Sequence, residues 1–336
     1  MPAPVESLFE ALHRTRRGST NFFAAREQVE QWTALGLLSW VETKDCLLIF
    51  RRSRDLHHVC HVASSADALT DALASSTLPK GPLVSDLVGR ENDLAPMTSA
   101  YQTAGFRKHT ALIRMVRMVD DSLPCQEHSD VAFAGPSDIA DIRAFLLKLL
   151  DRFADQIPEE DELRSAAARQ NLLIVRRHRE LGGVLVFDRT GLSTTLRYWY
   201  VHPEFRSEGI GARLINVFFR LSRGSRRIVL WVVQDNTASV EKYRHYGFQK
   251  ELLMDQIMTR KNTIEEVLKE LRPEFDFTAS DDFIGDGMLD SHDVVTLVSD
   301  LDRIYGISIS GIDIVPEHFQ NIAAIEQLIR KYAAEP

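Results

Sequence analysis

A repeated pattern constrains the fold of the first 261 residues more than any other feature. The stretch "GPLVSDLVGREN" followed by "AYQTAGFRKHTALIRMV" reads as strand, helix, Gly-Phe, strand, and so does "RRIVLWVVQDNT" followed by "KYRHYGFQKELLMDQIM". Tyr101 stands four residues before Gly105, and Tyr243 stands four before Gly247. The shared offset predicts two related α/β halves. The alternative is coincidence, because strand-helix-strand junctions are common.

The rest of the chain divides at two further places. Residues 120–130, "DDSLPCQEHSD", are polar and contain a proline, which is typical of a connector. We therefore predict one domain over residues 1–120 and a second over 128–260, where helices and strands alternate. The helix "NTIEEVLKELRPEF" follows almost without a linker. It begins a third predicted domain over 262–336.

The net charge of -8 is unevenly distributed. Residues 262–336 hold 16 acidic and 5 basic residues, a net of -11, whereas residues 1–261 hold 35 basic and 32 acidic residues, a net of +3. A phosphate-binding surface needs a basic excess, so nucleic acid is not an expected partner. The sequence has no signal-peptide pattern and no run of roughly 18 apolar residues, so we expect a cytoplasmic protein without a membrane partner.

Cysteine and histidine are not expected to carry the chemistry. Cys46, Cys60 and Cys125 are odd in number and lack metal or redox spacing, so we expect reduced thiols that serve packing. The cluster "LHHVCHV", residues 56–62, reads as a strand, and strand alternation divides its histidines between two faces. We therefore predict no metal site.

A glycine loop in the second domain indicates an anion site. In "YVHPEFRSEGIGARLINVFFRL" the glycines lie between a predicted strand and an amphipathic helix. Backbone N–H groups at a helix start are unpaired, and glycine lets an anion approach them closely. Two glycines also fit an ordinary tight turn. A second pattern, N-x-x-S-x-x-x-Y-x-x-x-G-F from Asn236 to Phe248, follows the next strand and favours a functional site.

On these two motifs, residues from about 128 to 260 resemble a GNAT (GCN5-related N-acetyltransferase) domain. The glycine loop is similar to the family's acyl-CoA pyrophosphate motif, (R/Q)-x-x-G-x-(G/A). The resemblance implies an α/β GNAT fold with a mixed sheet, in which acyl-CoA, with acetyl-CoA expected, lies between two splayed strands. It implies backbone hydrogen bonds from Val201 to the pantetheine arm. The other cofactor-binding residues that it designates are Arg206, Ser207, Gly209, Ile210, Gly211, Ala212 and Asn236.

The resemblance also makes Tyr243 the general acid that protonates the leaving thiolate. The alternative is a structural tyrosine on the core side of a helix. No general base is assigned, because a strand residue is more commonly packed or solvated than catalytic. The side chains considered are Tyr198, Tyr200, His202 and Glu180.

The first domain carries the later half of the repeated pattern without a glycine loop. We therefore expect a degenerate GNAT-like half that has lost cofactor binding. This tandem arrangement resembles FemABX-type and mycothiol-synthase-like transferases, in which a degenerate half shapes the acceptor cleft.

A serine in the acidic domain raises a second possibility of covalent chemistry. "GDGMLDSHDVVTLVSDL" places Ser291 directly before an amphipathic helix, where a serine commonly acts as the N-cap, and Asp290 could cap as well. Residues 262–336 resemble an acyl carrier protein, a small all-α four-helix bundle. The family's D-S-L or D-S-M motif stands here as Asp290-Ser291-His292, and the departure at His292 leaves partner docking in doubt.

The carrier resemblance implies 4'-phosphopantetheine on Ser291, attached by a phosphopantetheinyl transferase. It also implies biosynthetic enzymes that dock on an acidic surface. A candidate basic counterpart within the chain is the stretch with Arg220, Arg223, Arg226 and Arg227, which could equally be a solvated face.

The predicted function is therefore a GNAT-type acyltransferase that acts with its own carrier domain. It would transfer an acyl group between a CoA or carrier thioester and a small amine, free or carrier-bound. One alternative is a loading unit that moves an acyl group from acyl-CoA onto the carrier thiol. Another is a non-catalytic scaffold that presents the carrier.

Overall fold

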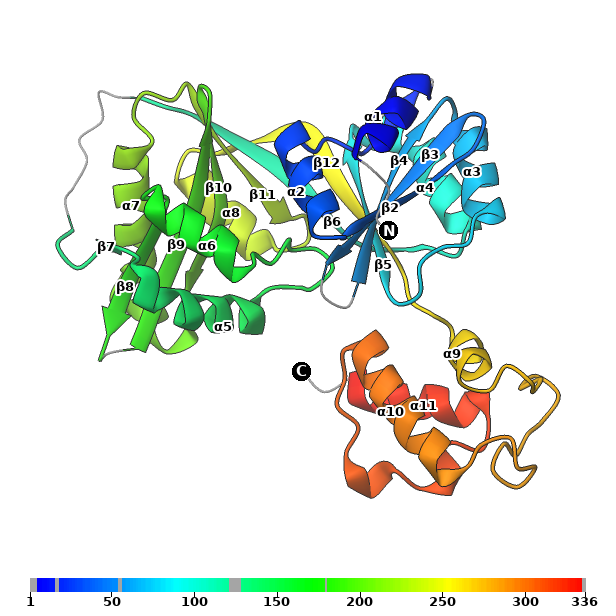
Figure 1. Ribbon diagram of the computed structural model, residues 1–336. Helices are drawn as coiled ribbons and strands as arrows, with labels where there is room; N and C mark the ends of the chain where they lie inside the picture. Colours follow the sequence, from blue (N-terminus) through cyan, green and yellow to red (C-terminus); the bar gives the residue numbers. More distant parts are fainter. Residues whose placement is uncertain (1–4, 16–17, 54–55, 121–127, 179, 334–336) are drawn as a thin grey trace. The chain divides into compact units, whose positions relative to one another are not determined.

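The computed structural model describes residues 5–15, 18–53, 56–120, 128–178 and 180–333 (Figure 1). Within these ranges, no helix combines the length and the apolar character that crossing a bilayer requires.

The chain divides into two units that interleave along the sequence. The first comprises Met1–Asp86, Pro96–Arg107 and Met258–Pro336, and the second comprises Leu87–Ala95 and Lys108–Ile257. The predicted domains, in contrast, are contiguous. The interleaving arises because β6 (Arg107–Met118) follows the first Gly-Phe pair in sequence but pairs antiparallel with β11 (Arg227–Val233) along the whole length of β11.

The first unit is built on strands in the order β2-β3-β4-β5, with a short β1 paired to β4. The inward face of α1 contributes Leu8, Ala11 and Leu12 to a core that includes Leu47 and Ile49 of β3. The elements are α1 (Val5–Arg14), β1 (Ser19–Thr20), α2 (Arg26–Ala34), β2 (Leu38–Glu42), β3 (Cys46–Ser53), β4 (Leu56–Ala63), α3 (Ala66–Ser75), β5 (Leu83–Gly89) and α4 (Glu91–Thr103).

The second unit is a mixed α/β sheet in the order β12-β6-β11-β10-β9-β8-β7. Strand alternation sends side chains to two cores, one under α7 and α8 and the other under α5 and α6 (Figure 1). Its remaining strands are β7 (Ala132–Phe133), β8 (Leu172–Arg177), β9 (Glu180–Thr190), β10 (Ser193–Val201) and β12 (Gln249–Arg260). Its helices are η1 (Pro136–Asp138), α5 (Ile139–Leu149), α6 (Glu160–Ala168), η2 (Pro203–Glu208), α7 (Ile210–Leu221) and α8 (Thr237–His245).

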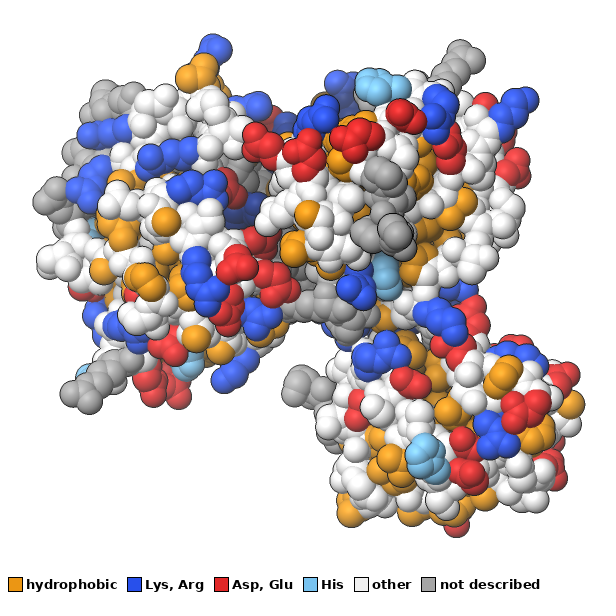
Figure 2. All heavy atoms as spheres, viewed as in Figure 1, with side chains coloured by type: hydrophobic (Ala, Val, Ile, Leu, Met, Phe, Trp, Pro, Cys, Tyr) orange, Lys and Arg blue, Asp and Glu red, His pale blue; other side chains and the backbone are white. Residues whose placement is uncertain are grey.

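Residues 262–333 form a helical segment with an apolar core of its own. Its elements are α9 (Ile264–Leu271), α10 (Ser291–Tyr305), η3 (Gly311–Asp313), η4 (Pro316–His318) and α11 (Ile322–Ala333). The prediction of four helices is therefore corrected to three α-helices and two 3-10 helices within these residues. A short helical piece was expected between α10 and α11, and η3 and η4 lie there. Acidic side chains recur on the face of this segment that Figure 2 shows.

The cysteines that the structure describes are free thiols. Cys46 is buried and Cys60 is partly buried, and burial raises the pKa of each thiol to about 12. Such thiols are poor nucleophiles at neutral pH. Cys125 lies outside the described residues, as does most of the predicted connector at 120–130. No group of His, Cys, Asp or Glu within the described ranges is arranged to hold a metal ion.

Candidate functional site

The strands β10 and β11 part from each other halfway along β10. They pair in parallel from Ser193 with Arg227 to Leu196 with Leu230, and a bulge at Arg197 ends the ladder. Beyond this point β10 stays paired only with β9, while β11 stays paired with β6 as far as Val233. We call the separation past Leu196 and Leu230 the β10/β11 opening.

The β10 side of this opening offers unpaired backbone groups. The amide of His202 donates to the carbonyl of Gly182 at 2.9 Å, which fixes the alternation of the β9–β10 ladder. In that alternation the N–H and C=O groups of Trp199 and Val201 point away from β9, toward the opening. No described strand pairs with this edge, so an extended ligand could hydrogen-bond along it.

The glycine loop lies where β10 leads into α7. Gly209 has φ +72°, a left-handed conformation that ends η2 and starts α7, and that glycine adopts at little cost. Gly183 of β9 lets α7 approach the sheet, because a Cβ there would lie 2.7 Å from Cγ2 of Ile210. The first amides of α7, from Ile210 to Ala212, precede the first intrahelical hydrogen bond, from Arg213 to Gly209. This geometry suits an anion.

A network of ion pairs braces the loop. Arg177 contacts Glu208 at 2.9 Å and Asp130 at 3.0 Å, and Arg213 contacts the same Asp130 at 3.0 Å. Arg213 also donates to the backbone carbonyl of Glu208 at 2.8 Å. Burial opposes ionisation of Asp130, but hydrogen bonding from Arg177 and the charge of Arg213 lower its pKa. This network could not be predicted from the sequence, because Asp130 and Arg177 are 47 residues apart and share no local pattern.

The arginines of the network hold the loop in place. Of the predicted loop residues, Ile210 is fully buried in the core, whereas the others are exposed or half-buried. Arg206 and Ser207 are exposed in η2, and the backbone from Gly209 to Ala212 follows directly. The loop therefore presents one exposed guanidinium, one hydroxyl and a helix start on a single stretch of chain.

Tyr243 lies on α8 beside β10. Its ring packs against Trp199 with the ring centres 5.8 Å apart, and its side chain is half-buried. Burial raises the pKa of the Tyr243 hydroxyl to about 12, so this hydroxyl is protonated at neutral pH and can donate. Asn236, predicted to bind the cofactor, is the N-cap of α8, and its Oδ1 accepts the Ser239 amide at 3.0 Å.

The side chains considered as bases are mostly engaged. Tyr198 donates to the backbone carbonyl of Gln156. His202 stacks on Phe145 and also packs against Phe205. Burial raises the pKa of both Tyr198 and Tyr200, and Glu180 is exposed at the start of β9.

Asp155, which was not among the predicted candidates, has a pKa in the range expected of a general base. Burial raises the pKa of Asp155, on the loop between α5 and α6, to about 6. An isolated aspartate in a loop carries no sequence signal of this kind, because the shift depends on neighbours brought together by folding.

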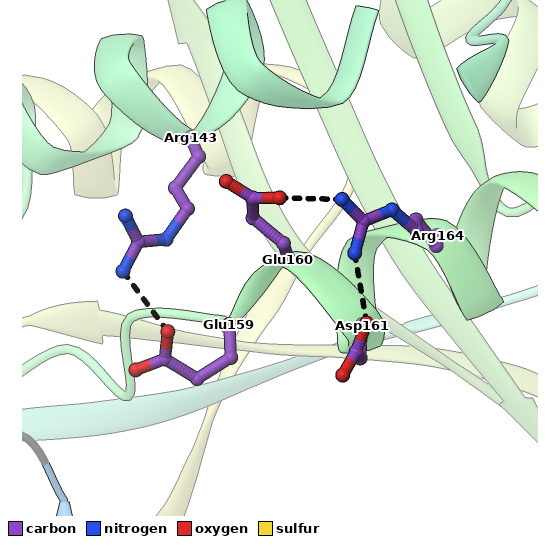
Figure 3. A pocket seen from close by; sticks show the side chains of 5 residues that line it. All are labelled: Arg143, Glu159, Glu160, Asp161 and Arg164. Carbon is purple, nitrogen blue, oxygen red and sulfur yellow. Dashed lines mark hydrogen bonds and ion pairs between the residues drawn. The ribbon is translucent and has the colours of Figure 1, made fainter. Parts of the chain in front are cut away.

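An open hollow of about 430 Å³ lies near α5 and α6 (Figure 3). Arg143 pairs with Glu159 at 2.9 Å, and Arg164 pairs with Glu160 at 2.5 Å and with Asp161 at 2.8 Å. These five side chains line the hollow, and none of them is a predicted site residue. Since its charges already pair with one another, we do not assign a ligand to it.

The first unit contains a related strand separation that its own chain occupies. Strands β4 and β5 pair in parallel only at His57 with Leu83 and at His58 with Val84. Past these pairs, the side chain of Asn21 donates to the carbonyl of Asp86 at 2.9 Å and accepts the amide of His61 at 2.7 Å. The segment at residues 18–21 thus bridges both strands.

Ser291 is the first residue of α10 and is exposed. The N-cap is Asp290, whose Oδ1 accepts the amides of His292 at 2.8 Å and Asp293 at 2.9 Å. Asp293 in turn accepts the Asp290 amide and pairs with Arg272 at 2.7 Å. The alternative interpretation of Ser291 as the cap is therefore wrong.

The basic stretch predicted as a partner surface surrounds the end of α7. Arg223, Arg226 and Arg227 are exposed and Arg220 is half-buried. Arg227 donates to the hydroxyl of Ser193 at 3.0 Å. A role in docking stays a prediction.

A protein-family model matches part of the second unit. Residues 144–248 match the model of the acetyltransferase (GNAT) family. An uncharacterized N-acetyltransferase of Methanocaldococcus jannaschii is 40% identical over 53 residues, which are 15% of this chain and 24% of that protein. The chain thus spans about a quarter of the length of this curated relative.

Solved structures with a detectable likeness include acetyltransferases. A GCN5-related N-acetyltransferase from Sphaerobacter thermophilus has a TM-score of 0.47 and 13% identity, covering 70% of this chain and 85% of that chain. A tandem GNAT protein from the clavulanic acid biosynthesis pathway has a TM-score of 0.41 and 14% identity, covering 64% and 78%. The match to the family model alone supports the finding that residues 144–248 of this chain form an acetyltransferase domain of the GNAT family.

Proposed function

We propose that the second unit transfers an acyl group from acyl-CoA to an amine. The observation that carries the proposal is the β10/β11 opening, which lies beside the glycine-started helix α7 within the part of the chain that matches the GNAT family. An unpaired strand edge and an anion-binding helix start suit the two ends of one ligand, a pantetheine arm and a pyrophosphate.

The roles follow from the positions of the residues. The backbone of Val201 would hydrogen-bond the pantetheine arm. The stretch from Arg206 to Ala212 would hold the pyrophosphate, with Asn236 supporting α8 nearby. The amine nitrogen forms a bond to the thioester carbonyl carbon, and the carbon–sulfur bond breaks. The Tyr243 hydroxyl, held protonated by its raised pKa, donates its proton to the leaving sulfur.

We further propose that residues 262–336 are a carrier domain with 4'-phosphopantetheine on Ser291. The residues fit that group, because the serine is exposed and Asp290 does the capping, so the hydroxyl is not needed to start α10. The group would supply a thiol that carries an acyl chain. A carrier in the same chain raises the local concentration of its cargo to roughly millimolar. Its acidic surface would favour basic partners, including a phosphopantetheinyl transferase.

Acetyl-CoA binding tests the first proposal. Substituting Gly209→Val forces a β-branched residue into a left-handed conformation at the loop, and we expect affinity measured by calorimetry to fall by about 10- to 100-fold. Gly224→Val is the matched control, since Gly224 has φ +85° in open space away from the loop. Equal losses in the two variants would contradict the proposed phosphate site.

Intact-protein mass spectrometry tests the second proposal. Incubation with a phosphopantetheinyl transferase and CoA should add one phosphopantetheine mass to the wild type and to Ser299→Ala, an exposed serine on the same helix. Ser291→Ala should gain nothing. Added mass on Ser291→Ala would overturn the assigned attachment residue. Transfer of an acetyl group from acetyl-CoA to the modified chain without any amine would favour the loading unit instead.

A further inference from the structure

The loop between α5 and α6 is fastened on both sides of the β10/β11 opening. Its residue Gln156 receives a hydrogen bond from Tyr198 of β10, just past the bulge where β10 leaves β11. Its residue Asp151 lies 2.7 Å, Oδ2 to Nε2, from His109 of β6. We call residues 151–157 the strap.

These two attachments place the strap across the opening. β6 pairs with β11 on the side away from β10, and Val233 at the end of β11 lies opposite Leu112. His109 therefore belongs to the part of β6 that runs past the end of β11. A loop tied to β10 at one point and to β6 at another spans the strands that bound the opening.

The strap is internally rigid and presents Asp155. The Asp155 amide donates to the Asp151 carbonyl at 2.8 Å, and Oδ2 of Asp155 accepts the Asp151 amide at 2.8 Å. Asp151 also accepts the Phe153 amide at 2.7 Å. No described residue hydrogen-bonds to Oδ1 of Asp155, and the side chain is only half-buried. That oxygen is the one available to a ligand.

Titratable groups from several elements gather around this carboxyl. Leu150, just before the strap, and Ile157, its last residue, pack in the same core as Tyr198 and Tyr200. Besides burial, the charges of Asp155 and Tyr243 both raise the pKa of Tyr200, so the three groups lie within electrostatic reach of one another. The other charged or titratable groups around this cluster are Asp151, His109, Glu162 and Arg197.

From this geometry we infer that Asp155 is the general base of the proposed acyl transfer and takes a proton from the acceptor amine. The inference rests on the proposed function. As the amine nitrogen bonds to the carbonyl carbon of acyl-CoA, its proton passes to Oδ1 of Asp155, and the sulfur leaves with the proton of Tyr243. The products are an amide and CoA thiol. Two carboxyl groups on the strap attract an acceptor that is a cationic primary ammonium group in solution, and this group releases one proton to solvent before its neutral nitrogen attacks.

The pKa of Asp155 suits this role. Burial raises it to about 6, whereas the hydrogen bond from His109 lowers the pKa of Asp151 to about 2 against the effect of burial. Asp155 is therefore ionised at neutral pH and is a better proton acceptor than its neighbour.

Asp155→Asn tests the inference, with acetyl-CoA and a panel of primary amines from ethanolamine to spermidine. We expect kcat/KM to fall about 100-fold or more, and the acidic limb near pH 6 to disappear from the pH–rate profile. Acetyl-CoA affinity, measured by calorimetry, should stay within twofold of the wild type. Asp71→Asn, an exposed carboxyl on α3, is the control and should change neither quantity.

Slow hydrolysis of acetyl-CoA, in which water replaces the amine, gives the same readout without an acceptor. An Asp155→Asn protein with a wild-type rate and an intact acidic limb would overturn the role of Asp155 while leaving the proposed function standing. A wild-type protein that fails to bind acetyl-CoA would overturn both.

Discussion

Two strand separations in this chain begin alike and end differently. Strands β4 and β5 part after two parallel pairs, and β10 and β11 part after four. In the first unit the backbone edge past the last pair is paired with the chain itself, because β1 lies against β4 at Val62 and Ala63. In the second unit the described residues leave the corresponding edge free. In the described part of this chain, therefore, the strand separation that a local segment completes has no free backbone edge, whereas the other leaves one for a possible extended ligand.

The two tyrosines of the repeated pattern also differ in burial between the units. Tyr101 is fully buried, and its hydroxyl lies 3.1 Å from Nδ1 of His61. Tyr243 is half-buried beside the opening. The same offset from Gly-Phe thus produces a structural hydroxyl in one unit and an accessible one in the other. At this position the first unit therefore offers no tyrosine hydroxyl to a ligand.

The largest expected difference comes from removing each hydroxyl. Tyr243→Phe should lower kcat roughly 100-fold with little effect on acetyl-CoA affinity, because the leaving sulfur loses its proton donor. Tyr101→Phe should leave kcat unchanged and cost about 1 kcal/mol of stability, because it removes one buried hydrogen bond. Steady-state kinetics measures kcat, and urea unfolding measures the free energy of unfolding. Tyr246→Phe, at the C-cap of α8, serves as a control, and a loss from it as large as that from Tyr243→Phe would contradict the assignment.

Removing the Asn21 bridge between β4 and β5 should have a smaller effect. Asn21→Ala leaves the His61 amide without its acceptor and removes the bridge to β5, so we expect the first unit to lose about 2 kcal/mol of stability. Hydrogen exchange of β4 amides measures this loss, and exposed Asn92→Ala should be neutral. Acetyl-CoA should still bind once per chain, since no glycine loop follows β4. A second equivalent of bound acetyl-CoA would show that the segment alone blocks a site.

Acid should also affect the stability of the two units differently. Burial lowers the pKa of His61 to about 4, so below its unfolded value of about 6.5 the unfolded chain binds the proton better. Stability of the first unit should be fully present above pH 6.5 and fall toward pH 4, by up to about 1.4 kcal/mol per pH unit. Asp155 has the opposite sign, because its raised pKa favours the folded state below about pH 6.

Urea unfolding at pH 7 and pH 5, followed through amide signals of β4 and β10, measures how the stability of each unit depends on pH. In His61→Gln, the stability reported by the β4 amides should depend less on pH. An unchanged pH dependence in that variant would mean that another group destabilises the first unit in acid.

Sequence patterns predicted the parts of the molecule that depend on local chemistry. Gly209 starts α7 because the left-handed backbone there favours glycine, and Asp290 caps α10 by a rule that operates within three residues. The alternation of helices and strands also follows from local periodicity, whereas the mixed sheet was implied by the family resemblance. The split of the histidines of β4 between two faces was equally readable, and His61 lies on the face that is buried.

The parts that the sequence could not predict depend on partners far apart in the chain. Asp130 meets Arg177, Asn21 meets Asp86, and His109 meets Asp151 only after the sheet has formed. Each of these side chains is ordinary in its own segment. The raised pKa of Asp155 belongs to the same class, since it arises from burial in the folded state. A single chain without relatives carries no pattern that pairs such positions.

The crossing of β6 into the second sheet has a practical consequence for anyone who wishes to isolate the acetyltransferase part. A protein fragment starting at residue 128 would retain the family match but lack the strand that covers β11. Its edge, with Ile228 and Leu230 in the sequence "RIVLWVV", would then be a long, apolar and unprotected template for other chains. Such a fragment should precipitate, and one starting before Arg107 should remain in solution.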